Sequence, residues 1–368
     1  MNPGGPLLSV TDLRTVFESD AGLVAAVDGV TWSVRRGETM ALVGESGCGK
    51  SVTALSILGL IPDPPGRVVS GSIRFWNRPD QEPIELSSLT PRQLRRIRGH
   101  RIAMVFQEPA TSLNPVLTVG EQILETVRLH RGLRRRAARD SALESLRRVG
   151  LTDPHLRFHQ YPHQLSGGMQ QRAMIAMALC CNPALLIADE PTTALDVTLQ
   201  AQILDLLGRL QAETRMGLLL ITHDIGVVAQ VADRVCVMYA GRIVEQADVA
   251  ELFHHPLHPY TQALLACSQR APAGSRRFRT IAGAVPAGSA YPPGCRFHPR
   301  CELSRQRAQA GRRHIHVVHD ERAEVTALRR CVHDDPVESG GEPELREARP
   351  GHLVACWEVT DADPRPAE

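Results

Sequence analysis

An eight-residue stretch, GESGCGKS at 44–51, is the feature that most constrains the fold of this chain. It matches the pattern of Gly, four residues of any kind, Gly, Lys and then Ser or Thr, which cradles phosphate where a strand runs into a helix. Residues 38–44 before it predict a strand, and residues 50–60 predict a helix that ends before the breaker PDPPG at 62–66. The sequence therefore predicts a phosphate site in an α/β fold.

Each position of this stretch suits the chemistry of a bound triphosphate. Its glycines let backbone N–H groups approach phosphate oxygens at a helix N-terminus, where the helix dipole favours negative charge. The Lys50 ammonium is expected to reach the β- and γ-phosphates, and the Ser51 hydroxyl to ligate Mg²⁺. The candidate nucleotide-binding residues here are Gly44, Glu45, Ser46, Gly47, Cys48, Gly49, Lys50, Ser51 and Val52.

A second apolar run, ALLIAD at 184–189, ends at two adjacent carboxylates, Asp189 and Glu190. A buried carboxylate without a partner is so costly that its pKa shifts until it is neutral. A Mg²⁺ ion beside the phosphate loop would supply the positive charge that Asp189 needs. Glu190 points elsewhere and can accept a proton from an attacking water, as a general base does. The alternative is a strand that ends at the surface with two solvated acids.

Strands and helices alternate along most of the chain. Residues 85–180 are mostly helical in pattern, and further elements are strands at 7–17, 24–34 and 217–223, a helix at 198–214, and a hairpin at 234–247 that turns at Ala240 and Gly241. This alternation indicates a mostly parallel sheet covered on both faces. From about residue 253 the composition shifts to Pro, His, Arg and Cys with little periodicity, so we expect two domains, 1–252 and 253–368.

Charge and hydropathy argue against several functional classes. Lys and Arg total 42 against 40 for Asp and Glu, which gives no footprint for nucleic acid as the main partner. No apolar run approaches the roughly 18 residues that span a bilayer, and the first ten residues lack the features of a signal peptide. We therefore expect a cytosolic protein whose nine cysteines are thiols or metal ligands rather than disulfides.

A third stretch, QLSGGMQQR at 164–172, completes a set of motifs that resembles that of ATP-binding cassette (ABC) ATPases. The set also contains a glutamine within MVFQEPATSLNP, LLIADE, TALD at 193–196 and ITHD at 221–224. The resemblance implies a P-loop ABC ATPase domain with a RecA-like core, an antiparallel β subdomain and a helical signature subdomain. It also implies that the signature serves the nucleotide of an opposite subunit, so a second ATPase subunit, identical or different, must be a partner.

The resemblance implies roles for individual residues. His223 is expected to contact the γ-phosphate, and Asp196 to bridge the two subunits. Phe17 stands in the place of the aromatic residue that stacks on adenine, although it could equally be a core residue of its strand. The implied catalytic residues are Glu190, His223 and Gln107, the implied Mg²⁺ ligands are Ser51, Gln107 and Asp189, and the implied signature contacts to ATP are Ser166, Gly167, Gly168 and Gln170.

Two further stretches, HPYTQALL at 258–265 and YPPGCRFHPRC at 291–301, are similar to the oligopeptide/dipeptide group of ABC importers. This implies a peripheral subunit at the cytoplasmic face of the cell membrane, beneath two permease subunits fed by an extracytoplasmic solute-binding protein. The solute is then a di- or oligopeptide, with nickel, glutathione or another small solute as alternatives. A soluble ABC ATPase acting on DNA is a weaker alternative, because the span from phosphate loop to signature is short and the net charge is near zero. A P-loop kinase would need neither the signature nor ITHD.

Four cysteines, Cys295, Cys301, Cys331 and Cys356, lie after residue 290, in the C-terminal part of the chain. Four thiolates can hold a [4Fe–4S] cluster or a structural Zn²⁺, and such a cross-link would explain how a tail with few aliphatic residues folds. The spacing of the first pair fits no common zinc finger, and residues 302–330 look like an insertion looped out of the site. Cluster, zinc and four thiols without metal are therefore all open, and a cluster is expected to be structural because the ATP cycle transfers no electrons.

Overall fold

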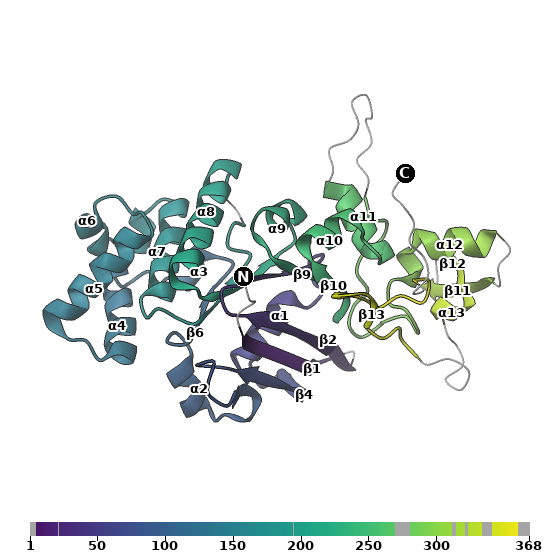
Figure 1. The fold of residues 1–368 in the computed structure, drawn as a ribbon, viewed down its shortest axis with the longest axis horizontal. Coiled ribbons are helices and arrows are strands. Elements are labelled where there is room, and N and C mark those ends of the chain that lie inside the picture. Colours follow the sequence, from purple (N-terminus) through teal and green to yellow (C-terminus); the bar gives the residue numbers. More distant parts are fainter. Residues whose placement is uncertain are drawn as a thin grey trace.

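Three parts lie in a row in this computed structural model: a group of helices, two sheets, and a tail (Figure 1). The helices α4 to α7 form one end, the strands lie in the middle, and α12 with β11 and β12 lies at the other end. The structure describes residues 5–20, 22–193, 195–268, 280–310, 314–320, 323–332 and 341–359. None of the helices in these ranges is both long enough and apolar enough to cross a bilayer.

The larger sheet holds the strands that the apolar runs predict. Its order is β13 (Arg346–Arg349), β14 (His352–Val354), β10 (Arg242–Asp248), β9 (Arg234–Tyr239), β3 (Thr39–Val43), β8 (Gly217–Thr222), β7 (Leu185–Asp189) and β6 (Ile102–Val105). The five strands from β9 to β6 are parallel, and β10, β14 and β13 are antiparallel. Strands β3, β7 and β8 are buried along their whole length, as the prediction of a sheet covered on both faces requires.

Alternate residues of the central strands pack into two different cores. On one face Leu185 and Ile187 pack with α1 (Lys50–Ile57), and on the other Leu186 and Ala188 pack with α8 (Val197–Thr214). Helix α9 (Ile225–Val231) packs against β3 and β9 in a third core. The predicted helices at 50–60 and 198–214 are therefore confirmed, and their apolar faces are what cover the sheet.

The smaller sheet is antiparallel, in the order β2 (Gly22–Arg35), β1 (Pro6–Ser19), β4 (Gly66–Phe75) and β5 (Ile84–Glu85). It contains the two strands predicted at 7–17 and 24–34. Its buried residues, among them Val10, Leu13 and Val30, share one core with α1 and the larger sheet. The two sheets therefore enclose α1, the helix that follows the phosphate loop.

The helical region predicted at 85–180 is confirmed, with one strand that the pattern did not predict, β6. Its elements are η1 (Leu86–Ser88), α2 (Pro91–Ile97), α3 (Pro109–Ser112), α4 (Val119–Arg131), α5 (Arg135–Arg148), α6 (Pro154–Phe158), η2 (Pro162–Gln164) and α7 (Gly167–Leu179). Helix α4 begins with a capping box: the Thr118 hydroxyl accepts from the Glu121 N–H, and the Glu121 carboxylate accepts from the Thr118 N–H.

The tail forms more regular structure than its weak periodicity predicts. It contains α10 (Val249–His254), α11 (Pro259–Ser268), η3 (His298–Arg300), α12 (Glu302–Gln309), β11 (His314–Asp320), β12 (Ala323–Leu328) and α13 (Arg329–Val332). Its last described part returns to the larger sheet, where Val354 of β14 pairs with Glu245 of β10. The rings of Tyr260 and Phe297 lie 4.7 and 5.2 Å from the ring of Tyr239, centroid to centroid. The tail thus shares a core with the sheet.

Candidate functional site

The phosphate loop joins the end of β3 to the start of α1, as predicted. Gly49 caps α1 with a φ of +107°, a backbone conformation that favours glycine. A Cβ added there would lie 2.3 Å from the carbonyl oxygen of Ala26. Only glycine therefore fits at the point where the loop becomes a helix, and the loop is held against β2.

The Lys50 side chain folds back over the loop. It is buried, and its ammonium donates to the carbonyl oxygens of Gly44 at 2.8 Å and Glu45 at 2.9 Å. These bonds hold the only lysine of the chain at the mouth of the loop. A lysine ammonium is a compact donor with three N–H groups. It can therefore bind an incoming phosphate without a large movement of the Lys50 side chain.

Two of the expected Mg²⁺ ligands come together. The Ser51 hydroxyl on α1 donates to a carboxylate oxygen of Asp189 at the end of β7, at 3.1 Å. Burial raises the pKa of Asp189, the hydrogen bond from Ser51 opposes this shift, and the neighbouring Glu190 adds to it. A hydroxyl and a buried carboxylate side by side are the hard oxygen ligands that Mg²⁺ prefers, and a bound cation would keep Asp189 ionised.

The carboxylate of Glu190 is the centre of a second cluster. It accepts from the amide of Gln107 at 3.0 Å and the hydroxyl of Thr193 at 2.9 Å, and Nδ1 of His223 lies 3.1 Å away. Glu190 has a φ of +45°, which is unusual for a residue with a side chain. The chain thereby turns out of β7, and Glu190 faces Gln107 and His223 while Asp189 faces Ser51.

The electrostatics of Glu190 suit a proton acceptor. Burial alone would raise its pKa, but hydrogen bonds from His223 and Thr193 and the charges of His223 and Lys50 outweigh burial and lower it. Glu190 is therefore ionised at neutral pH. The structure brings together Gln107, Glu190 and His223, which follow the ends of β6, β7 and β8. The sequence did not single out Thr193, although it lies in the TALD stretch.

The signature lies on the helical side of the molecule, away from α1 (Figure 1). Ser166 precedes α7 with an exposed side chain that caps no N–H group, and Gly167 is exposed with open space where a Cβ would lie. Gly168 by contrast is buried against Leu199. The Gln170 amide donates to the carbonyl oxygens of Pro162 and Leu165, so this side chain stabilises the turn before the helix.

Two further predicted residues, Asp196 and Phe17, lie in well-defined surroundings. Asp196 is the N-cap of α8, and its carboxylate accepts from the backbone of Leu199 at 2.9 Å while the residue stays exposed. The half-buried ring of Phe17 on β1 lies over Gly66 of β4, where an added Cβ would lie 2.6 Å from a ring carbon. The ring thus packs against the backbone of Gly66 and stays partly exposed, so it can also stack on a base.

Four of the five cysteines in the tail line one small cavity. Cys295, Cys301, Cys331 and Cys356 all line a space of about 10 Å³, and the backbone N–H of Cys295 donates to the carbonyl of Cys331 at 2.9 Å. Between Cys301 and Cys331 the chain forms α12 (Glu302–Gln309), and the hairpin of β11 and β12 then carries it back to Cys331. In the described part of the chain no three or more His, Cys, Asp or Glu side chains are already arranged around a metal position.

Burial dominates the chemistry of these thiols. It raises the pKa of Cys301 to about 12, and burial together with the other three cysteines raises that of Cys295 well above its usual value. None of the nine cysteines, all of which lie in the described part of the chain, forms a disulfide in this structure. Buried thiols of this kind stay protonated unless a cation compensates their charge.

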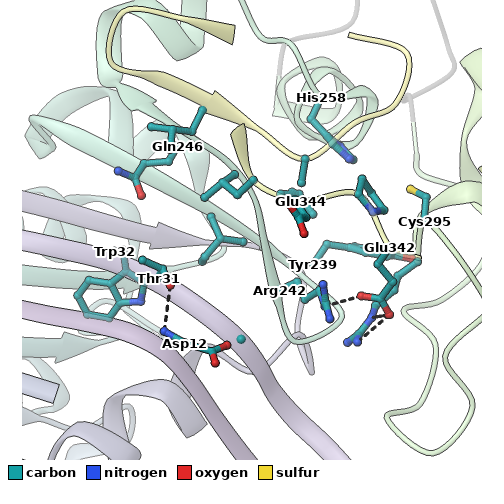
Figure 2. A pocket seen from close by; sticks show the side chains of 18 of the residues that line it. Asp12, Thr31, Trp32, Tyr239, Arg242, Gln246, His258, Cys295, Glu342 and Glu344 are labelled. Atoms are coloured by element: carbon teal, nitrogen blue, oxygen red, sulfur yellow. Dashed lines mark hydrogen bonds and ion pairs between the residues drawn. The ribbon is translucent and has the colours of Figure 1, made fainter. Parts of the chain in front are cut away.

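A larger cavity, of about 590 Å³, lies elsewhere, between β2, β10 and the tail (Figure 2). Trp32, Arg242, His258 and Glu342 are among its lining residues, and Arg242 and Glu342 point toward one another in an ion pair. Of the residues that the sequence singled out, Cys295 alone lines it. This cavity is therefore separate from the phosphate loop and from Glu190.

Comparison with known proteins agrees with the fold and the motifs. The ABC transporter family matches residues 27–193, and the family of the oligopeptide/dipeptide transporter C-terminal region matches residues 244–307. The oligopeptide transport ATP-binding protein AppD of Bacillus subtilis is 50% identical over 295 residues, which cover 80% of this chain and 88% of AppD. The dipeptide transport ATP-binding protein DppD of the same organism is also 50% identical, over 80% of this chain and 86% of DppD.

Solved structures show the same architecture. The dimeric structure of the ATP-binding cassette MJ0796 in a post-hydrolysis state, bound to ADP and Pi, matches with a TM-score of 0.58 and 28% identity. The match covers 66% of this chain and 99% of that one. Together with the Glu190 cluster, the phosphate loop and the signature, these similarities show that the chain belongs to the ATP-binding subunits of ABC transporters and carries the C-terminal region of the oligopeptide/dipeptide group.

Proposed function

We propose that this ABC ATPase binds and hydrolyses ATP to drive the import of di- or oligopeptides. The observation that carries the proposal is the pair of sites at the end of β7, where Asp189 meets Ser51 and Glu190 meets Gln107 and His223. The relatives at 50% identity are named for oligopeptide and dipeptide transport, and the tail match points to the same group. Nickel, glutathione or another small solute stays an alternative, because the solute does not touch an ATPase subunit.

The residues divide the work of hydrolysis between binding and proton transfer. Lys50 and the backbone N–H groups of the loop hold the β- and γ-phosphates, and Phe17 stacks on adenine. Ser51, Asp189 and Gln107 would hold Mg²⁺, and the ion would supply positive charge beside the phosphates. Glu190 accepts a proton from the attacking water, and His223 fixes the carboxylate and contacts the γ-phosphate.

A second ATPase subunit completes each site. Support comes from the exposure of Ser166 and Gly167 at the start of α7, which leaves their hydroxyl and N–H groups open to a ligand from outside this chain. Asp196, also exposed at the N-terminus of α8, is then at the subunit junction. We propose a homo- or heterodimer, bound to two permease subunits at the cytoplasmic face of the membrane and served by an extracytoplasmic solute-binding protein.

We further propose that the chain divides at 252 and 253 into the ATPase domain and a C-terminal domain with a metal centre. The four cysteines that line one cavity support a [4Fe–4S] cluster as its cross-link, with zinc as the alternative. The local core there is small, consisting of Ala308, Leu328 and Cys331, so a metal would contribute much of its stability. The four cysteines share this cavity but are not yet arranged around a metal position, so their side chains would rearrange on binding.

Transport in a reconstituted system tests the proposed function. The chain is co-purified with the permeases and the second ATPase encoded beside it, placed in vesicles, and supplied with the binding protein and labelled di- and oligopeptides. ATP-driven uptake of peptide that is absent in a Glu190→Gln complex is the expected result. Uptake of nickel or glutathione without peptide would replace the proposed solute, and ATP-dependent retention on DNA would remove the transport function.

Anaerobic purification tests the metal centre. Visible absorption with iron, sulfide and zinc analysis is expected to show four irons per chain, and a Cys331→Ser variant is expected to lose them. Zinc without iron would replace the cluster, whereas a colourless, metal-free protein in which Cys295, Cys301, Cys331 and Cys356 all titrate as thiols would exclude both metals.

A further inference from the structure

One side chain of the tail reaches into the phosphate loop. The guanidinium of Arg300 donates to both carboxylate oxygens of Glu45, at 2.8 and 2.9 Å, and its Nε donates to the carbonyl of Ala282 at 2.8 Å. The side chain of Arg300 is 6% exposed and that of Glu45 28%. A bidentate pair with this little solvent is strong and geometrically specific.

Glu45 is held at its backbone as well as at its side chain. Its N–H donates to the hydroxyl of Tyr260 on α11 at 2.9 Å, and its carbonyl oxygen accepts from the Lys50 ammonium at 2.9 Å. Tyr260 and Arg300 both belong to the region that follows the ATPase motifs. The second residue of the phosphate loop is therefore positioned by the tail.

A second arginine, four residues before Arg300, contacts the phosphate loop indirectly. Arg296 donates to the carbonyl of Ala240 at 2.6 Å and pairs with Asp28. The next residue of that turn, Gly241, donates its N–H to the carbonyl of Cys48 in the loop at 2.9 Å. Residues 295–301 thus contact the phosphate loop directly, through Arg300, and indirectly, through Arg296 and the turn at Ala240 and Gly241.

We propose that Arg300 is a positioning residue of the ATP site, which holds the Glu45 carboxylate away from the phosphates and neutralises its charge. Glu45 places a negative charge in a loop whose task is to bind a polyanion, and an unpaired carboxylate there would repel it. The bidentate pair removes this repulsion and fixes the start of the loop at once. The inference rests on the assignment of residues 44–51 as the phosphate loop.

The affinity of the full-length chain for Mg-ATP, measured by calorimetric titration, tests this role. Arg300→Gln leaves Glu45 unpaired, and we expect the Kd to rise about 10-fold, within the usual range of coupling between sites. Adding Glu45→Gln to that variant removes the charge and is expected to recover most of the loss. The matched control is Arg349→Gln, which breaks an ion pair of the tail with Glu251, 2.9 Å long, and is expected to leave the Kd unchanged.

Several outcomes would overturn the proposal. A parental Kd in Arg300→Gln, or a loss that Glu45→Gln does not relieve, would show that the pair does not act on the phosphates. If circular dichroism shows that Arg300→Gln is unfolded, Arg300→Lys replaces it, because lysine keeps the charge but not the bidentate geometry. A parental Kd in Arg300→Lys, together with a parental Kd in Arg349→Gln, would remove the positioning role. In the assembled transporter the KM for ATP should rise in Arg300→Gln while kcat changes little. A parent chain that bound no Mg-ATP would count against the phosphate-loop assignment itself.

Discussion

Glu190 presents one carboxylate to three partners, Gln107, Thr193 and His223, at the end of β7. Glu190→Gln keeps the shape and the hydrogen-bonding reach of the side chain but cannot take a proton. We expect the variant to bind Mg-ATP with parental affinity and to hydrolyse it at least about 10²-fold more slowly, the usual scale for loss of a general base. Single-turnover phosphate release measures the rate of hydrolysis, and nucleotide titration measures the affinity for Mg-ATP.

The control for this variant is another glutamate on the surface of the same domain. Glu213→Gln removes an exposed i,i+4 ion pair with Arg209 on α8, and exposed pairs contribute little. It is expected to match the parent in both measurements. Steady turnover near the parental rate in Glu190→Gln would remove Glu190 from the mechanism.

Phe17 tests the base-binding end of the site. Phe17→Ala removes a ring that packs against Gly66, and loss of stacking on a base costs about 1–3 kcal/mol. Stacking is nearly equal in the ground and transition states, so we expect the KM for ATP to rise while kcat changes little. ATP and GTP kinetics of the assembled transporter check this. A loss of kcat at an unchanged KM would identify Phe17 as a core residue only.

Residues that act through local pattern could be predicted from the sequence, and residues that act through distant contacts could not. Lys50, Ser51, Asp189 and Glu190 were found because a strand end or a loop of fixed spacing determines where each side chain points. The contact between Arg300 and Glu45 was not predicted, because Glu45 lies in the first part of the chain and no spacing relates the two residues. Such contacts can be identified only from the tertiary structure, which brings the tail next to the phosphate loop.

At the scale of elements, the start of α1 depends on one glycine. Gly49 has a φ of +107°, and a Cβ there would lie 2.3 Å from backbone and 2.8 Å from the Met238 side chain. We expect Gly49→Ala to lower the free energy of unfolding by about 1–3 kcal/mol and to abolish Mg-ATP binding, since the loop must shift. Gly208→Ala, in open space within α8, is the matched control and should stabilise by roughly 0.5–1 kcal/mol. Urea unfolding and nucleotide titration compare the two, and equal stability would contradict the strain.

The start of α11 carries a pH-sensitive group. His258 is fully buried, its Nδ1 accepts from the backbone of Tyr260, and burial lowers its pKa from 6.5 to about 4 while the nearby Glu245 carboxylate opposes the shift. Between these two pH values the unfolded chain binds the proton and the folded chain does not. Its contribution to stability is therefore present above about pH 6.5 and is lost as the pH falls toward 4.

Replacement of this histidine isolates its contribution. His258→Gln cannot titrate, so between pH 7.5 and pH 5 the parent should lose about 2 kcal/mol more of its unfolding free energy than the variant does. The difference between the two proteins cancels the titration of the carboxylates that both share. Denaturant unfolding at the two pH values measures it, and parallel losses would mean that His258 is accessible to protons in the folded state.

Elements with a strong period were predicted well, and short ones were not. The apolar runs that became β7 and β8 and the amphipathic run that became α8 each have one clear pattern. Strand β6 has only four residues within a helical region, and β14 has three. Both form because a neighbouring strand offers hydrogen-bond partners, β7 for the first and β10 for the second, which is a tertiary effect with no local signal.

At the scale of the whole molecule, the compositional boundary near residue 252 is not a boundary of the core. Tyr260 and Phe297 of the tail are buried against Tyr239 of β9 and belong to the same cluster as Val43 beside the phosphate loop. Side chains of this size contribute roughly 1.5–3 kcal/mol each when buried. The ATPase domain thus depends on the tail for part of its core packing and for the ion pair of Arg300 with Glu45.

Truncation therefore distinguishes a boundary of composition from a boundary of the folded core. A chain of residues 1–252 loses Tyr260, Leu265 and Phe297 from one cluster, so we expect its unfolding free energy to fall on the order of 5 kcal/mol, a large share of what a domain has. A chain of residues 1–310 keeps these three side chains and Arg300 while it loses Cys331 and Cys356. It should bind Mg-ATP more tightly than the shorter chain, as calorimetry can measure. Equal stability and equal affinity in the two chains would mean that the ATPase domain folds independently of the tail.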